Sequence, residues 1–282
     1  MNNPIVVSTI AYDGYDLDTA LKGFAHAGVQ NVEIAYSEAY TAPVTENVFS
    51  PQEAERVCAL LEANRLLCFC LAAHMDMSHP FSVEKFKRRI DFAVNLGARY
   101  IVSTTGPAAN RETFMENIKV LGEYAGKSGL ILCLENIGDG RPNIIDSAAP
   151  ASALIREINL PNVRVNYDFA NLLPHCSARL RPEEDYRSAL PEIGYFHIKD
   201  VVRHPDGSWS FPAVGDGMID YGKVMRDIAA HPAPIPLSLE LSLRITRLSD
   251  ATPVRADRAV ALDKITAALR RSLDFVGSRL SG

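Results

Sequence analysis

The sequence predicts an α/β fold, a single (β/α)8 barrel of the TIM type. Short runs rich in apolar and β-branched residues alternate with longer segments that carry helical spacing or helix-start signals, which is typical of a parallel sheet. Eight such units in 282 residues give about 35 residues per unit, close to the size of a barrel with some long loops. No low-complexity linker interrupts the chain, so we expect one domain over residues 1–282.

The expected strands are short and extended in character. They cover residues 5–10, 31–36, 66–73, 100–104, 130–136, 163–168, 195–200 and 235–241. An open doubly wound sheet is the alternative. Its usual dinucleotide-binding signature, G-x-G-x-x-G, is missing from the turn after the first strand, residues 10–14, so the barrel is preferred.

Helix-start and helix-stop signals mark the segments between the strands. Ser50 can cap a helix with Pro51 in its first turn and Glu53 three residues after the cap. Gly97 and Gly129 closely follow two further helical segments, as glycines commonly do. The expected helices cover residues 17–27, a segment that opens at 50, and residues 82–96, 110–127, 151–158, 182–190, 221–230 and 254–276.

The composition narrows the class of protein. With 47% hydrophobic and 22% charged residues and a net charge of −5, the chain is typical of a soluble globular protein and disfavours nucleic acid or an anionic membrane as partner. The five cysteines form no C-x-x-C pair, which indicates reduced thiols, and the longest apolar run, residues 66–73, is too short to span a membrane. We therefore expect a cytoplasmic location.

The expected strands end on or near polar residues, at the end of a barrel where catalytic groups sit. In strand order these residues are Glu33, His74, Glu135, Asp168, His197 with Lys199, and Glu240. In the last strand, Ser238 and Glu240 share one face and leucines occupy the other. A sandwich would bury the leucines and expose Glu240, whereas a barrel turns the leucines toward the helices and Glu240 into the mouth.

Four of these residues form a candidate metal site on four consecutive strands: Glu135, Asp168, His197 and Glu240. Taken singly, each has a plain structural explanation, as a surface acid, a turn residue or a core histidine. Taken together, three carboxylates in a partly desolvated cavity would repel one another unless a cation neutralised them. One divalent ion satisfies this set, with Mn²⁺, Mg²⁺ or Co²⁺ expected and Zn²⁺ possible.

Short motifs at these positions resemble the xylose isomerase-like TIM-barrel superfamily, and within it the sugar (phosphate) isomerases and epimerases, including the ketose 3-epimerases. The motifs are LEN (134–136), YDFAN (167–171), FHIKD (196–200), GDGMIDY (215–221) and LEL (239–241). The resemblance implies that all four residues hold the metal and that Glu135 and Glu240 are the acid–base pair. It also implies a substrate contact for Arg203, and a homodimer or homotetramer.

The resemblance is broken at Asn171, where many relatives have a histidine. An amide can bind a substrate hydroxyl but cannot shuttle a proton. Further expected substrate-binding residues are Glu33, His74 and Lys199, and for His74 a structural role is the alternative. Endonuclease IV shares the fold, but the acidic charge and the missing histidines disfavour nucleic-acid chemistry.

The expected activity is that of a divalent-metal-dependent isomerase or epimerase acting on a ketose or related keto-sugar, a small carbohydrate, through a metal-stabilised enediolate. Two glutamates on different strands suit an epimerase, because one can deprotonate the carbon and the other can reprotonate it. A metal-dependent lyase or dehydratase of a keto-sugar, keto-inositol or related polyol is the alternative. A carbohydrate-binding barrel without catalysis is the third reading.

A long loop covers residues 203–219 near the expected barrel mouth. It contains a Pro-Asp-Gly turn signal at residues 205–207, followed by Trp209, the single tryptophan. We expect a small hairpin that helps to exclude water from the site. An irregular surface excursion is the alternative.

Overall fold

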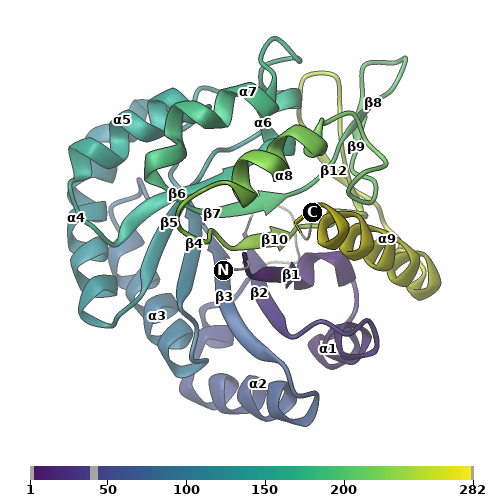
Figure 1. The fold of residues 1–282 in the computed structure, drawn as a ribbon. Helices are drawn as coiled ribbons and strands as arrows, with labels where there is room; N and C mark the ends of the chain where they lie inside the picture. The colour runs from purple at the N-terminus through teal and green to yellow at the C-terminus, as the bar shows by residue number, and fades with distance from the viewer. Residues whose placement is uncertain (1–2, 39–43, 281–282) are drawn as a thin grey trace.

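The computed structural model describes residues 3–38 and 44–280, and it contains the closed parallel barrel that the sequence predicts (Figure 1). The strands close in the order β1-β10-β7-β6-β5-β4-β3-β2. Their bounds are β1 Ile5–Ser8, β2 Asn31–Ser37, β3 Leu67–His74, β4 Tyr100–Thr104, β5 Ile131–Glu135, β6 Val163–Asp168, β7 Ile193–Ile198 and β10 Leu237–Leu239.

Helices surround the barrel; in Figure 1, α1 to α5 follow one another around it from the lower right, past the bottom and the left, to the upper left. The α-helices are α1 Leu17–His26, α2 Pro51–Ala63, α3 Ser82–Asn95, α4 Arg111–Lys127, α5 Ala148–Ile158, α6 Phe169–His175, α7 Pro182–Asp185, α8 Tyr221–Ala229 and α9 Leu262–Leu280. Short 3₁₀ helices are η1 Thr9–Tyr12, η2 Glu46–Phe49, η3 Ala108–Asn110 and η4 Tyr186–Glu192. As predicted, the Ser50 side chain caps α2, accepting a hydrogen bond from the backbone N–H of Glu53 at 3.2 Å.

Two expected elements differ from the structure, and one helix was not expected. Residues 254–276 are not one helix: Pro253–Arg255 is strand β12, where the Arg255 side chain pairs with Asp13, and α9 begins only at Leu262. The expected helix over 182–190 is the short α7 followed by η4. Helix α6 was not expected; it begins directly after β6 because the Asp168 side chain accepts a hydrogen bond from the Asn171 N–H.

The apolar core has two layers. Inside the barrel a small cluster fills the space between the strands, and it includes Cys70, Tyr100, Val102, Cys133 and Tyr195. A larger cluster lies between the strands and the helices, and it contains the leucines of β5 and β10. The leucines of the last strand therefore face the helices, as the barrel predicts, and the alternate residues of that strand are left for the barrel interior and its mouth.

A small antiparallel sheet is built from the loops that follow β7 and β10. It has the order β12-β11-β9-β8, formed by β8 Val202–Arg203, β9 Trp209–Ser210, β11 Ile245–Arg247 and β12 Pro253–Arg255. In Figure 1 the labels β8, β9 and β12 lie together beside α9. The loop over residues 203–219 thus contains one hairpin of this sheet. Among the described residues, no helix is both long and apolar enough to cross a membrane.

Candidate functional site

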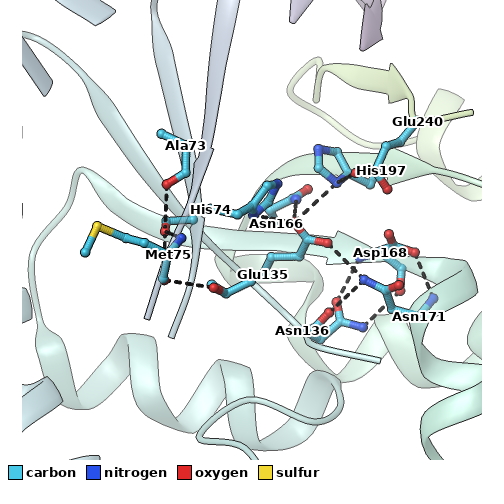
Figure 2. Close-up of polar contacts among 12 residues, drawn as sticks. Ala73, His74, Met75, Glu135, Asn136, Asn166, Asp168, Asn171, His197 and Glu240 are labelled. Carbon is cyan, nitrogen blue, oxygen red and sulfur yellow. Dashed lines mark hydrogen bonds and ion pairs between the residues drawn. The ribbon is translucent and has the colours of Figure 1, made fainter. Parts of the chain in front are cut away.

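Four side chains converge at the carboxyl ends of consecutive barrel strands. Glu135 ends β5, Asp168 ends β6, His197 lies near the end of β7, and Glu240 directly follows β10. One nitrogen or oxygen atom from each of the four lies within 4.8 Å of the corresponding atoms of the others. Figure 2 shows the four side chains pointing toward one another. All four are largely buried, and Glu240 is the most exposed at 9%.

This donor set fits one divalent cation. Two ligands on opposite sides of an ion with bond lengths of about 2.1 Å are about 4.2 Å apart, so these atoms need little movement to bind one. The Nδ1 atom of His197 is buried and makes no hydrogen bond within the described part of the chain. It lies 3.4 Å from Glu135 Oε2 and 3.7 Å from Glu240 Oε1, where a metal ligand would be placed. Three carboxylates and an imidazole could therefore hold one ion, and its identity is left open.

Two asparagines fix the orientation of the acids. The Asn136 side chain bridges β5 and β6, donating to the Asp168 carbonyl at 2.9 Å and accepting from the Asp168 N–H at 2.8 Å. The Asn171 Nδ2 group donates to Glu135 Oε1 at 3.0 Å. The backbone N–H of Asn171 donates to Asp168 Oδ1 at 2.9 Å, which leaves Asp168 Oδ2 facing the centre. Asn171 thus gives Glu135 and Asp168 one neutral donor each.

Lys199 brings a permanent cation to the same centre. Its Nζ lies 2.6 Å from Asp168 Oδ2 and 2.5 Å from Glu240 Oε2. Burial would raise the pKa of Glu240, but Lys199, His197 and His74 lower it to about 2. The pKa of Asp168 is raised to about 7, chiefly by burial. The neighbouring carboxylates of Glu240 and Glu135 add to this increase, and the ammonium of Lys199 reduces it. Lys199 therefore keeps Glu240 ionised and offsets part of the negative charge of the cluster.

The two histidines near the centre have different surroundings. Burial alone would lower the pKa of His197, but the carboxylates of Glu33, Glu135 and Glu240 raise it well above its usual value. His74, at the end of β3, places Nδ1 3.6 Å from Glu135 Oε2 and also lines the cavity. His74 is thus positioned to contact both a metal ligand and a bound molecule.

Glu135 and Glu240 line a cavity of about 360 Å³, whereas Asp168 and His197 are fully buried and are not among its lining residues. Of the expected substrate-binding residues, His74, Asn171 and Lys199 line it. Glu33 and Arg203 are not among its lining residues. Glu33 is fully buried below the cavity against His197, and Arg203 is exposed on the small sheet, where its guanidinium stacks 5.2 Å from the Trp209 ring centre. The geometry gives no support to a substrate contact for either residue.

The small sheet supplies part of the cavity wall that the sequence did not indicate. Phe211, Ile245 and Arg247 line the cavity, and the Arg247 side chain is buried. Its Nη1 donates to the Ala251 carbonyl at 3.1 Å, and its Nη2 donates to Asn171 Oδ1 at 3.4 Å. Arg247 lies in the segment between the last barrel strand and α9, whose strands were not expected, so no pattern marked it as inward-facing.

The sequence matches the family model described as "Xylose isomerase-like TIM barrel" over residues 22–265. The chain belongs to the xylose isomerase-like TIM barrel family. The match covers β2 to α9 as far as Ile265, and so includes all four residues of the candidate metal site. No curated protein sequence gives a significant match.

Solved structures show the fold of this xylose isomerase-like barrel in distant relatives. A xylose isomerase domain protein from Planctomyces limnophilus is 18% identical with a TM-score of 0.70, and the alignment covers 99% of this chain and 98% of that one. D-Psicose 3-epimerase from Clostridium cellulolyticum H10 is 13% identical with a TM-score of 0.71, at 99% coverage of both chains. The probable 3-DHS dehydratase AsbF of Bacillus anthracis is 15% identical with a TM-score of 0.69, covering 95% of this chain and 97% of that one.

Proposed function

We propose that the protein is a divalent-metal-dependent isomerase or epimerase of a ketose or related keto-sugar. The observation that carries the proposal is the convergence of Glu135, Asp168, His197 and Glu240 beside a cavity that Glu135 and Glu240 line. The 3-epimerase among the structural relatives supports it at the level of the fold. The four residues would hold the ion, with Mn²⁺, Mg²⁺ or Co²⁺ favoured by the oxygen-rich set and Zn²⁺ also accommodated.

The proposed reaction moves a proton at a carbon next to a carbonyl. A bound divalent ion would polarise the carbonyl oxygen and stabilise the negative charge that develops there. Glu240 stays ionised beside Lys199, so its carboxylate can accept the proton from carbon. Glu135 reaches the cavity from β5, with β6 and β7 between it and Glu240, and can return a proton from another side. Each positioned group contributes on the order of 10²- to 10⁴-fold.

A dehydratase on the same site is the second candidate. Lys199 favours it, because its buried ammonium faces the cavity and could stabilise the negative charge that develops on a departing hydroxyl. The probable 3-DHS dehydratase among the structural relatives has the same fold. Asn171 weighs against any version of this reaction that needs a histidine there as the acid.

Incubation of the Mn²⁺-loaded protein with a panel of ketoses in D2O, followed by NMR, tests the proposal. We expect deuterium to enter the carbon next to the carbonyl, because the carbon-bound proton exchanges through a carboxylate. A chelator should abolish the exchange, and Glu240→Gln should lower its rate by at least 10²-fold.

Glu192→Gln is the matched control, because Glu192 is also largely buried but binds Ser152 and Arg156 away from the cavity. It should exchange deuterium like the wild type. A product lighter by one water would favour the dehydratase. Protein that binds no divalent ion when one is supplied would contradict both candidates.

A further inference from the structure

A buried contact crosses the barrel interior beneath the candidate metal site. Glu33 lies on β2 and His197 on β7, and both side chains have an exposed fraction of 0%. Glu33 Oε2 lies 3.1 Å from His197 Nε2. In the barrel order β1 and β10 separate the two strands, so this contact is made across the interior and not between neighbouring strands.

Strands β1 and β10, which lie between β2 and β7, place polar side chains next to Glu33 and His197. The register places Ser8 of β1 opposite Glu33, and Ser238 of β10 opposite His197. Both hydroxyl groups are neutral and fully buried. Glu33 is therefore the charged group that meets the imidazole from this side, and burying a carboxylate so deeply is costly without a strong partner.

The contact determines which ring nitrogen faces the candidate metal site. An ionised carboxylate only accepts hydrogen bonds, so Nε2 of His197 must carry the hydrogen that it shares with Glu33. The other nitrogen, Nδ1, points toward Glu135 and Glu240 at 3.4 and 3.7 Å. A neutral imidazole bound in this way has its lone pair at Nδ1, on the side of the other proposed ligands.

We propose that Glu33 is a positioning residue that fixes the ring orientation and tautomer of His197, so that Nδ1 is presented to the metal ion. The proposal rests on the proposed function, since it takes His197 as a ligand. It replaces the substrate contact expected for Glu33 with a role beneath the site. A carboxylate behind a ligating histidine orients the ring and strengthens it as a ligand, and loss of such a group typically lowers metal affinity about 10- to 100-fold.

Metal affinity of the purified chain, residues 1–282, tests this role without any substrate. Mn²⁺ binding is measured by calorimetry for the wild type, Glu33→Gln and Glu33→Asp, and the absorption spectrum is recorded for the Co²⁺-loaded forms. We expect Glu33→Gln to bind Mn²⁺ about 10- to 100-fold more weakly, because an amide can donate to Nε2 and allow the other tautomer. Glu33→Asp keeps the charge and should retain more affinity than Glu33→Gln. The Co²⁺ absorption bands should shift in Glu33→Gln.

Two controls separate positioning from a general loss of structure. Glu192→Gln removes another largely buried acid, far from the site, and should bind Mn²⁺ like the wild type. In a double-mutant cycle, Glu33→Gln should have little further effect on Mn²⁺ affinity once His197→Gln has removed the ring on which it acts. If Glu33→Gln fails to fold, Glu33→Asp, which pulls the carboxylate back, takes its place in the cycle.

The possible outcomes are distinct. Wild-type Mn²⁺ affinity and an unchanged Co²⁺ spectrum in Glu33→Gln would overturn the positioning role and leave the proposed function intact. The role would also be overturned if Glu192→Gln lost as much Mn²⁺ affinity as Glu33→Gln. The same holds if Glu33→Gln lowered Mn²⁺ affinity as much in the His197→Gln background as in the wild type. A wild-type protein that binds neither Mn²⁺ nor Co²⁺ would instead contradict the proposed function.

Discussion

Asn171 connects a proposed metal ligand to an arginine of the small sheet. Its Nδ2 group donates to Glu135 Oε1 at 3.0 Å, and its Oδ1 atom accepts from Arg247 Nη2 at 3.4 Å. An amide can do both because it carries a donor and an acceptor at the same end. The residue that departs from the resembled family's pattern therefore has a defined place in this site, holding Glu135 rather than moving a proton.

Asn171→Ala should therefore lower both stability and metal affinity. Glu135 Oε1 would lose its donor in a buried setting, which costs about 1–3 kcal/mol of unfolding free energy. Mn²⁺ affinity should fall about 10-fold or more, because the carboxylate is no longer oriented. Urea unfolding and calorimetric titration with Mn²⁺ measure the two effects.

Asn162→Ala is the matched control for this change. Asn162 also holds buried backbone, donating to the Gly122 carbonyl at 2.8 Å, but it lies outside the cavity lining. It should lose stability and keep the wild-type Mn²⁺ affinity. If Asn171→Ala also kept that affinity, the proposed orientation of Glu135 by Asn171 would be wrong.

At the scale of elements, Asp200 organises the loop that leads from the small sheet to α8. Its buried carboxylate accepts backbone N–H groups from Val201 at 2.9 Å, Gly215 at 3.0 Å and Gly217 at 2.9 Å. A Cβ on Gly217 would lie 2.1 Å from Asp200 Oδ1, so only glycine fits there. The GDG motif that carried part of the family resemblance thus has a structural explanation in this loop.

Asp200→Ala should loosen this loop. Several buried N–H groups would lose their acceptor, at about 1–3 kcal/mol for each group that finds no replacement. We expect at least about 2 kcal/mol of lost unfolding free energy and faster amide hydrogen exchange over residues 213–219. Asp206→Ala is the control, since Asp206 accepts from the Ser208 N–H in an exposed turn of the preceding hairpin. Equal exchange in both variants would contradict the role of Asp200.

The barrel elements could be predicted, whereas strands β11 and β12 of the small sheet could not, for a physical reason. Successive side chains of a strand point to opposite faces, and this alternation depends only on the local sequence. The inward direction of Glu135 and Glu240 could therefore be derived from their neighbours. Strands β11 and β12 have three residues each and exist through pairing with a distant hairpin. Three residues are too few to show the apolar–polar alternation that identifies a strand in a sequence. The inward direction of Arg247 depends on the pairing with the distant hairpin. The same limit applies to Glu33, whose partner is contributed by another strand.

At the scale of the whole molecule, the proposed ion would tie together the ends of β5, β6, β7 and β10, which are consecutive in the closed barrel. The small sheet contributes Ile245 and Arg247 to the cavity at this mouth, and Phe211, which directly follows β9, lines the same cavity. Trp209 is almost fully buried in that sheet and is paired in register with Arg247. Its fluorescence therefore reports on the small sheet, while far-UV circular dichroism reports mainly on the barrel and its helices.

If residues 1–282 form one domain, both probes should give the same thermal unfolding transition. Free Mn²⁺ at 100 times its dissociation constant should add about 2.7 kcal/mol to the unfolding free energy, because the ion binds only the folded chain. Both transitions should then move upward together, and the shift should be lost in a variant with Asp168→Asn and Glu240→Gln. A fluorescence transition that precedes the circular dichroism transition would show that the small sheet unfolds separately. A midpoint that Mn²⁺, Mg²⁺, Co²⁺ and Zn²⁺ all leave unchanged would argue against a metal site that couples these four strands.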